Sequence, residues 1–199
     1  MGILNNGSEP NPPLKSWTMP VPAFKAIHFI PRGSENDIRK TPARELYAVA
    51  HDLLTPGGGN HWCFYISISD DSSVRIDASP SGTPGSVMPM GQKANVVVSE
   101  LAELFPQEAQ HTCRLGIRPG ATIGDFLDAI IQYGREKYDF DHDGRGCRYW
   151  TSTQIDLFLQ LGLILNQAEA DQAKDDILIE FADKKQTGRR YPLTVGQYY

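Results

Sequence analysis

This sequence of 199 residues has few cysteines, no long hydrophobic run and no dense basic stripe. Its three cysteines, Cys63, Cys113 and Cys147, are an odd number without the spacing of a disulfide framework, which is typical of reduced thiols in the cytoplasm. No apolar run approaches the roughly 18 residues that cross a bilayer, and the N-terminal segment lacks the pattern of a secretion signal. We therefore expect a cytoplasmic protein with no membrane span.

Charge is also modest in this chain. Lys and Arg number 19 and Asp and Glu number 24, so that the formal net charge is −5. A nucleic-acid surface needs basic residues gathered into a patch or stripe, and the short basic stretch 184–190 is too small for one. We expect no nucleic-acid partner and no cofactor, and a small molecule or a peptide as the class of substrate.

The chain length is suited to one substantial core. Residues 1–22 are rich in proline, asparagine, glycine and serine, a composition that buries little apolar surface and predicts a flexible arm. Residues 23–199 have a globular composition and are expected to form a single domain.

Hydrophobic periodicity in this domain predicts strands that are followed by helices. The stretch 61–69 has the clearest alternation, and the segment 79–91, rich in Pro, Gly and Ser, is expected to be a long loop. These patterns predict an α+β fold in which helices pack on an antiparallel sheet. The expected strands are 24–30, 61–69, 74–78, 95–99 and 113–118, and the expected helices are 41–54, 122–135, one from 147 onward, and 168–184.

Cys147 follows a glycine-rich turn and begins a predicted helix, where free N–H groups and the helix dipole favour a thiolate. A nucleophilic thiol also needs a base, for which His61 is the candidate, and Asp77 on the next strand is the candidate that orients it. Strand alternation places His61 on the face opposite Trp62 and Phe64. We therefore expect the Cys147 helix to pack on the face that carries His61.

Three segments carry a resemblance. The stretches 60–65 (NHWCFY), 74–77 (VRID) and 144–150 (GRGCRYW) resemble an uncharacterised domain family found in fungi, over roughly residues 24–164.

The order of a histidine strand, a polar strand and a cysteine-led helix is also remotely similar to the circularly permuted papain-like hydrolases and acyltransferases, including the lecithin retinol acyltransferase group. This resemblance implies that Cys147 is the nucleophile, His61 the base and Asp77 the orienting group. Those enzymes often have asparagine before the cysteine, where this chain has Gly146.

Other interpretations of Cys147 and His61 remain compatible with the sequence. Free cysteine is often a buried small apolar residue, so Cys147 is also compatible with a purely structural role. In that case the protein is a non-catalytic module that binds a ligand or a protein, or an accessory enzyme of fungal metabolism without covalent catalysis.

Two patterns in the sequence are similar to metal sites but also fit ordinary structure. Asp139, Asp141 and Asp143 match the first half of a calcium loop, but Trp150 stands where the bidentate glutamate is required, so a standard EF-hand is excluded. The pairs 61/63 and 111/113 each place His and Cys on one strand face and form a conceivable zinc cluster with the cysteine at 147. The spacing favours ordinary strands, and no metal is expected.

Overall fold

A computed structural model describes residues 23–53 and 59–199, so the predicted arm 1–22 lies outside the described residues. The helices are α1 (Glu35–Lys40), α2 (Ile123–Gln132), α3 (Cys147–Gln160) and α4 (Gln167–Ile177). The strands are β1 (Ile27–Ile30), β2 (Glu45–Leu53), β3 (Asn60–Ser67), β4 (Ser73–Pro84), β5 (Gln92–Leu101), β6 (His111–Leu115), β7 (Tyr138–Phe140), β8 (Ile179–Ala182), β9 (Lys185–Arg190) and β10 (Gln197–Tyr198).

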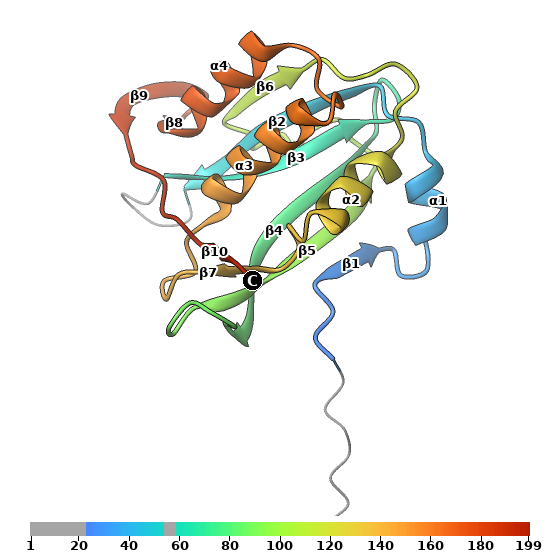
Figure 1. Cartoon of the computed structure of the whole chain (residues 1–199). Helices are drawn as coiled ribbons and strands as arrows, with labels where there is room; N and C mark the ends of the chain where they lie inside the picture. The colour runs from blue at the N-terminus through green and yellow to red at the C-terminus, as the bar shows by residue number, and fades with distance from the viewer. Residues whose placement is uncertain (1–22, 54–58) are drawn as a thin grey trace, which may run out of the picture.

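One large sheet organises the molecule (Figure 1). Its strand order is β10-β7-β5-β4-β3-β2-β6, with antiparallel pairing throughout this path, and β1 adds to β5 in parallel. The predicted α+β class, with helices packed on an antiparallel sheet, is confirmed. Among the described residues, no helix combines the length and the hydropathy needed to cross a membrane.

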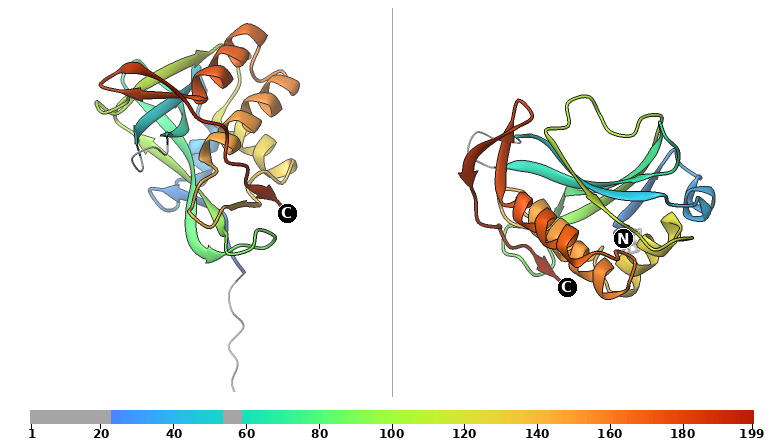
Figure 2. Two further views of the ribbon diagram at one scale, coloured as in Figure 1. Left: turned by 90° about the vertical axis from the view of Figure 1, so that its left-hand side faces the viewer. Right: turned by 90° about the horizontal axis from the view of Figure 1, so that it is seen from above.

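Helices α2, α3 and α4 cover one face of the sheet, as the view from above makes clear (Figure 2). The main core lies between these two layers and includes Phe64, Trp150 and Phe158. The opposite face carries a smaller cluster of Val49, Cys63 and Tyr65, against which Leu101 at the end of β5 and Phe105 and Ala109 of the following segment pack. The central strands therefore have buried side chains on both faces.

The expected helix 41–54 is wrong, because this segment forms β2 in the middle of the sheet. Pro42 follows Thr41, which is extended and ends the short helix α1, as expected for a residue before proline. Leu46 and Ala48 then point into the main core, whereas Val49 points to the opposite face. A strand that is buried on both faces lacks clear polar alternation, so its pattern is easily taken for a helix.

Two further boundaries differ from expectation. The expected loop 79–91 is shorter, because β4 continues to Pro84 and pairs there with Gln92 of β5. The expected helix 168–184 ends at Ile177, and the chain then turns into the β8–β9 hairpin. Asp183 and Lys184 form that turn with positive φ angles of 51° and 60°, a conformation typical of tight hairpins.

Candidate active site

The candidate site lies where strands β3 and β4 separate. The ladder between these strands ends at the pair Phe64 and Ile76. Before Phe64, helix α3 rather than β4 lies beside β3. The backbone of Trp62 faces the first turn of α3: its N–H lowers the pKa of the Cys147 thiol, and its C=O accepts a hydrogen bond from Oγ1 of Thr151 at 3.2 Å. Two residues one turn apart on α3 thus bind one residue of β3, which sets the position of the Cys147 thiol.

Helix α3 packs on the face opposite to the one expected. Phe64 contacts Trp150 and Phe158 of α3, with ring centroids 6.2 and 5.6 Å apart. Burying these large apolar side chains stabilises the fold far more than covering the polar face would. Helix α3 therefore packs on the apolar face. Cys147 still reaches His61, because the first residue of α3 lies in the gap between the two strands.

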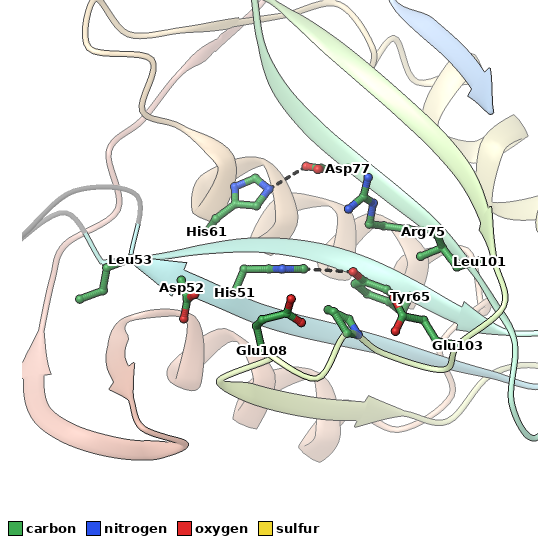
Figure 3. Close-up of a pocket in the computed structure, with 11 residues that line it drawn as sticks. His51, Asp52, Leu53, His61, Tyr65, Arg75, Asp77, Leu101, Glu103 and Glu108 are labelled. Carbon is green, nitrogen blue, oxygen red and sulfur yellow. Dashed lines mark hydrogen bonds and ion pairs between the residues drawn. The ribbon is translucent and has the colours of Figure 1, made fainter. Parts of the chain in front are cut away.

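His61 connects the thiol to a carboxylate. Its Nε2 atom lies 2.7 Å from Oδ1 of Asp77 (Figure 3), and its ring lies close enough to the Cys147 thiol for each group to shift the pKa of the other. The His61 and Asp77 side chains are only 15% and 17% exposed, and Cys147 is 8% exposed. The structure therefore brings together all three residues that the sequence singled out, in the order Cys147, His61, Asp77.

The electrostatics of these groups favour an ion pair. Burial alone raises the pKa of Cys147, but the hydrogen bond and charge of His61, the Trp62 N–H and the Arg148 charge bring it below its usual value. Burial lowers the pKa of His61, yet its hydrogen bonds with Asp77 and Cys147 raise it to about 10. The pKa of Asp77 is lowered despite burial, because His61 and Arg75 stabilise its charge. These shifts favour a thiolate beside an imidazolium.

Arg148 is a buried cation next to the candidate nucleophile. Its guanidinium donates to the carbonyl oxygens of Ile177, Tyr191 and Pro192, at distances of 3.1, 3.3 and 2.8 Å. It forms no ion pair with a carboxylate among the described residues. The charge of Arg148 lowers the pKa of Cys147, and the charge of Cys147 acts to raise the pKa of Arg148. The thiolate is therefore the counter-charge of Arg148.

Gly146 precedes Cys147 for a steric reason. It has a φ angle of 149°, and a Cβ atom there would lie 2.7 Å from the Tyr138 hydroxyl. That hydroxyl donates to the Gly146 carbonyl at 3.0 Å. A residue with a side chain, such as asparagine, therefore does not fit at this position without a shift of Tyr138.

Cys147 and His61 border a cavity of about 350 Å³. Its walls are mainly apolar, and Gln92 supplies an amide group. The lining residues are His61, Ala78, Ser79, Pro80, Gln92, Phe140, Asp143, Gly144 and Cys147. Met88 and Met90, in the segment between β4 and β5, do not line it, and Met90 is 83% exposed.

A second cavity, of about 450 Å³, lies on the other side of His61, and most of the residues that line it are polar or charged (Figure 3). His51 projects from β2 there, with Nε2 3.2 Å from both Cys63 Sγ and Tyr65 Oη. Arg75 points toward Asp77 from β4. Sequence reasoning missed His51, because it fell in a segment expected to be helical, and no local motif marks Arg75, Gln92 or Arg148.

Two groups among the described residues have ligand atoms that converge closely enough for a metal ion. They are His61 with Cys63 and Asp77, and His111 with Cys113 and Asp176. The two groups lie on opposite faces of the sheet, because the register places His111 opposite Ala50 and Ala50 opposite Trp62. A single cluster that joins both His/Cys pairs with Cys147, as conceived from the sequence, is therefore wrong.

The aspartates that match half of a calcium loop in the sequence form separate hydrogen bonds in the structure. Asp139 is fully buried and accepts hydrogen bonds from the backbone N–H groups of Val87 and Met88, at 2.6 and 3.1 Å. Asp141 accepts from the backbone of Asp143 and Arg145 and so orders its own turn. These carboxylates hold loops in place and do not converge on one point.

Comparison with known proteins adds a family. No curated protein and no solved structure matches the chain. A family model does match, over residues 46–199, a range that contains His61, Asp77 and Cys147. That family is described as the domain of unknown function DUF7770, and the expected membership of an uncharacterised domain family is thereby confirmed. With more than half of its length matched, the chain belongs to the DUF7770 family.

Proposed function

We propose that this protein is a small cysteine-dependent hydrolase or acyltransferase that works through an acyl-thioester at Cys147. In this proposal His61 is the general base and acid, and Asp77 orients its ring. The observation that carries the proposal is the continuous contact from thiol to imidazole to carboxylate at the start of a helix, beside a cavity. The same order of cysteine, histidine and aspartate is the basis of the hypothesis that the fold is permuted papain-like.

The chemistry follows from these positions. The Cys147 thiolate attacks an acyl carbonyl carbon, and the carbonyl electron pair moves to the oxygen. When this intermediate collapses, the leaving group departs with a proton from His61, and the acyl group stays on sulfur. Water, or an acceptor alcohol or amine, then attacks the thioester while His61 takes its proton, and the thiolate is released.

Two sets of donors are suited to the developing oxyanion. The first N–H groups of a helix have no partner within the helix, and those at the start of α3 lie next to the nucleophile. Gln92 accepts a hydrogen bond from the backbone N–H of Gly82 through Oε1 at 3.0 Å, which leaves its NH₂ group as the donor for the cavity it lines. The apolar walls formed by Ala78, Pro80 and Phe140 are suited to an acyl chain.

A second function is favoured by the low exposure of Cys147. In this alternative the thiol only joins α3 to β3 through Trp62, and the protein is a binding module that uses the polar cavity around Arg75. Such a module requires no reactive thiol. The two proposals therefore differ in one measurable property of Cys147.

The test is the alkylation rate of each cysteine as a function of pH, measured by mass spectrometry on the intact fold. Burial raises the pKa values of Cys63 and Cys113, so these thiols serve as internal controls. The enzyme proposal expects Cys147 to react fastest, with an apparent pKa below the free-thiol value of about 8.5. In His61→Ala this advantage should fall at least about tenfold at neutral pH, since one pKa unit changes the thiolate fraction tenfold. A Cys147 that reacts only after unfolding would contradict it and favour the binding module.

A further inference from the structure

A second His/Cys/Asp group lies on the face of the sheet that the helices cover, away from the candidate active site. His111 and Cys113 lie two residues apart on the edge strand β6, so their side chains share one face. Asp176 lies in the last turn of α4. Oδ2 of Asp176 lies 2.9 Å from His111 Nε2 and 3.3 Å from Cys113 Sγ. Three potential ligand atoms from two elements thus converge on one point.

The carboxylate of Asp176 is in an unfavourable place for an unpaired charge. It is only 5% exposed and lies in the C-terminal turn of a helix, where the helix dipole is negative. Among the described residues, its only ion-pairing partner is His111, with no lysine or arginine. Buried carboxylates of this kind are normally paired with a cation or bound to a metal.

We propose that His111 Nε2, Cys113 Sγ and Asp176 Oδ2 bind one Zn²⁺ ion, with a water molecule as the fourth ligand. Zinc takes nitrogen and oxygen ligands at about 2.0 to 2.1 Å and sulfur at about 2.3 Å in a tetrahedron. Those bond lengths place N and O about 3.3 Å apart and S and O about 3.5 Å apart. The present separations of 2.9 and 3.3 Å require side-chain shifts of only a few tenths of an ångström.

The surroundings already orient the ligands. The Phe181 ring stacks on the His111 ring with centroids 4.1 Å apart and an interplanar angle of 4°. Gln172 donates from Nε2 to Oδ1 of Asp176 at 2.9 Å, which leaves Oδ2 directed at the other two ligands. Support of this kind around the ligands is typical of metal sites. The His111 side chain is 30% exposed, which provides a path for the ion and room for the water.

Metal binding here has a proton balance. The Cys113 thiol, which now donates to Asp176, loses its proton to solvent, and His111 binds zinc as a neutral ring with its proton on Nδ1. Because the thiol must lose its proton before it binds zinc, zinc affinity should increase as the pH rises.

The other convergent group is less suited to a cation. His61 and Asp77 already bond with each other, and His61 also bonds with Cys147. The Arg75 guanidinium adds positive charge beside Asp77. The electrostatic argument therefore selects the group on β6 and α4.

The test uses the full chain, freed of metal with a chelator and titrated with Zn²⁺ by calorimetry and with Co²⁺ by absorption spectroscopy. We expect one equivalent of Zn²⁺ to bind with micromolar or tighter affinity and to raise the melting temperature. Co²⁺ should produce a thiolate-to-metal charge-transfer band and the visible bands of a tetrahedral site. Cys113→Ser should abolish the charge-transfer band, and His111→Gln and Asp176→Asn should each weaken Zn²⁺ binding at least about tenfold.

Cys63→Ser and Cys147→Ser are the matched controls, since each removes one of the other thiols and should leave the cobalt spectrum unchanged. Circular dichroism of the metal-free proteins checks that each variant folds, and His111→Gln decides the matter if Cys113→Ser does not. The absence of saturable binding would overturn the proposal. So would a charge-transfer band that survives in Cys113→Ser and disappears in Cys63→Ser or Cys147→Ser.

Discussion

Nε2 of His61 lies 2.7 Å from Oδ1 of Asp77, although the strands that carry the two residues are no longer paired at this point. Both side chains lie on the same face of the sheet, and the separation of β3 and β4 makes room for the first residue of α3. The same gap leaves the backbone of Trp62 free to bind Cys147 and Thr151. A local break in one ladder therefore accounts for the whole arrangement.

The role of Asp77 can be tested by Asp77→Asn. The change removes the charge that raises the pKa of His61, so the imidazolium becomes less stable and the pKa of Cys147 should rise. We expect the alkylation rate of Cys147 at pH 7 to fall about tenfold for each unit by which this pKa rises. Asp70→Asn is the control, because Asp70 is almost fully exposed and pairs only with Arg44 among the described residues. An unchanged alkylation profile in Asp77→Asn would contradict the orienting role.

His61 should make stability depend on pH. Its folded-state pKa is raised from 6.5 to about 10, so its charged form stabilises the fold fully below pH 6.5. This contribution is lost progressively as the pH rises toward about 10. In urea denaturation at several pH values, the difference in free energy of unfolding between wild type and His61→Gln should shrink from pH 6.5 to pH 10. A difference that stays constant over this range would show that His61 is not an imidazolium in the folded protein.

The contact between α3 and β3 can be tested by Thr151→Val. Thr151 is fully buried, and valine keeps its shape while removing the hydroxyl that binds the Trp62 carbonyl. A buried carbonyl left without a donor costs about 1 to 3 kcal/mol in free energy of unfolding. The measurement is urea denaturation, with the exposed Thr112→Val as a control that should change stability by less than about 0.5 kcal/mol. Equal effects of the two changes would refute the importance of this hydrogen bond.

Arg148→Met should affect both stability and the thiol. Three carbonyl oxygens lose their charged donor, and we expect a loss of about 2 to 4 kcal/mol in free energy of unfolding. Removal of the nearby cation should also raise the pKa of Cys147. Arg114→Met is the matched control, because Arg114 forms an exposed pair with Glu45 that solvent screens, and its loss should change stability much less than the loss of Arg148. A Cys147 titration that is the same in Arg148→Met and wild type would exclude Arg148 as a counter-charge.

Several features of the fold follow from local chemistry and were predictable. Thr122 and Asp125 form a reciprocal capping box that starts α2, as their spacing indicates. The turn before Cys147 starts α3 at the expected residue. Alternation along β4 separates Val74 and Ile76, which are in the core, from Arg75 and Asp77, which line a cavity with His61. In each case neighbouring residues supply the hydrogen bonds or the faces that decide the structure.

Other features depend on residues that are distant in the sequence. β2 is a strand because β3 and β6 pair with it on both sides, which its own composition does not reveal. Asp176 meets Cys113 across 63 positions, and Thr151 meets Trp62 across 89. Gly146 shows why the difference from the papain-like pattern exists, since only the tertiary structure places Tyr138 against it.

The sequence by itself determined the α+β class, the helix that Cys147 begins, and the presence of His61 and Asp77 on two adjacent strands. Those features depend on periodicity, caps and turns, which act over a few residues. Only the tertiary structure decided on which face of the sheet α3 packs, and that the thiol nevertheless reaches His61. Helix α3 packs on the core face because burial of Phe64, Trp150 and Phe158 stabilises this arrangement. The gap between β3 and β4 lets the first residue of the helix contact His61 from that face.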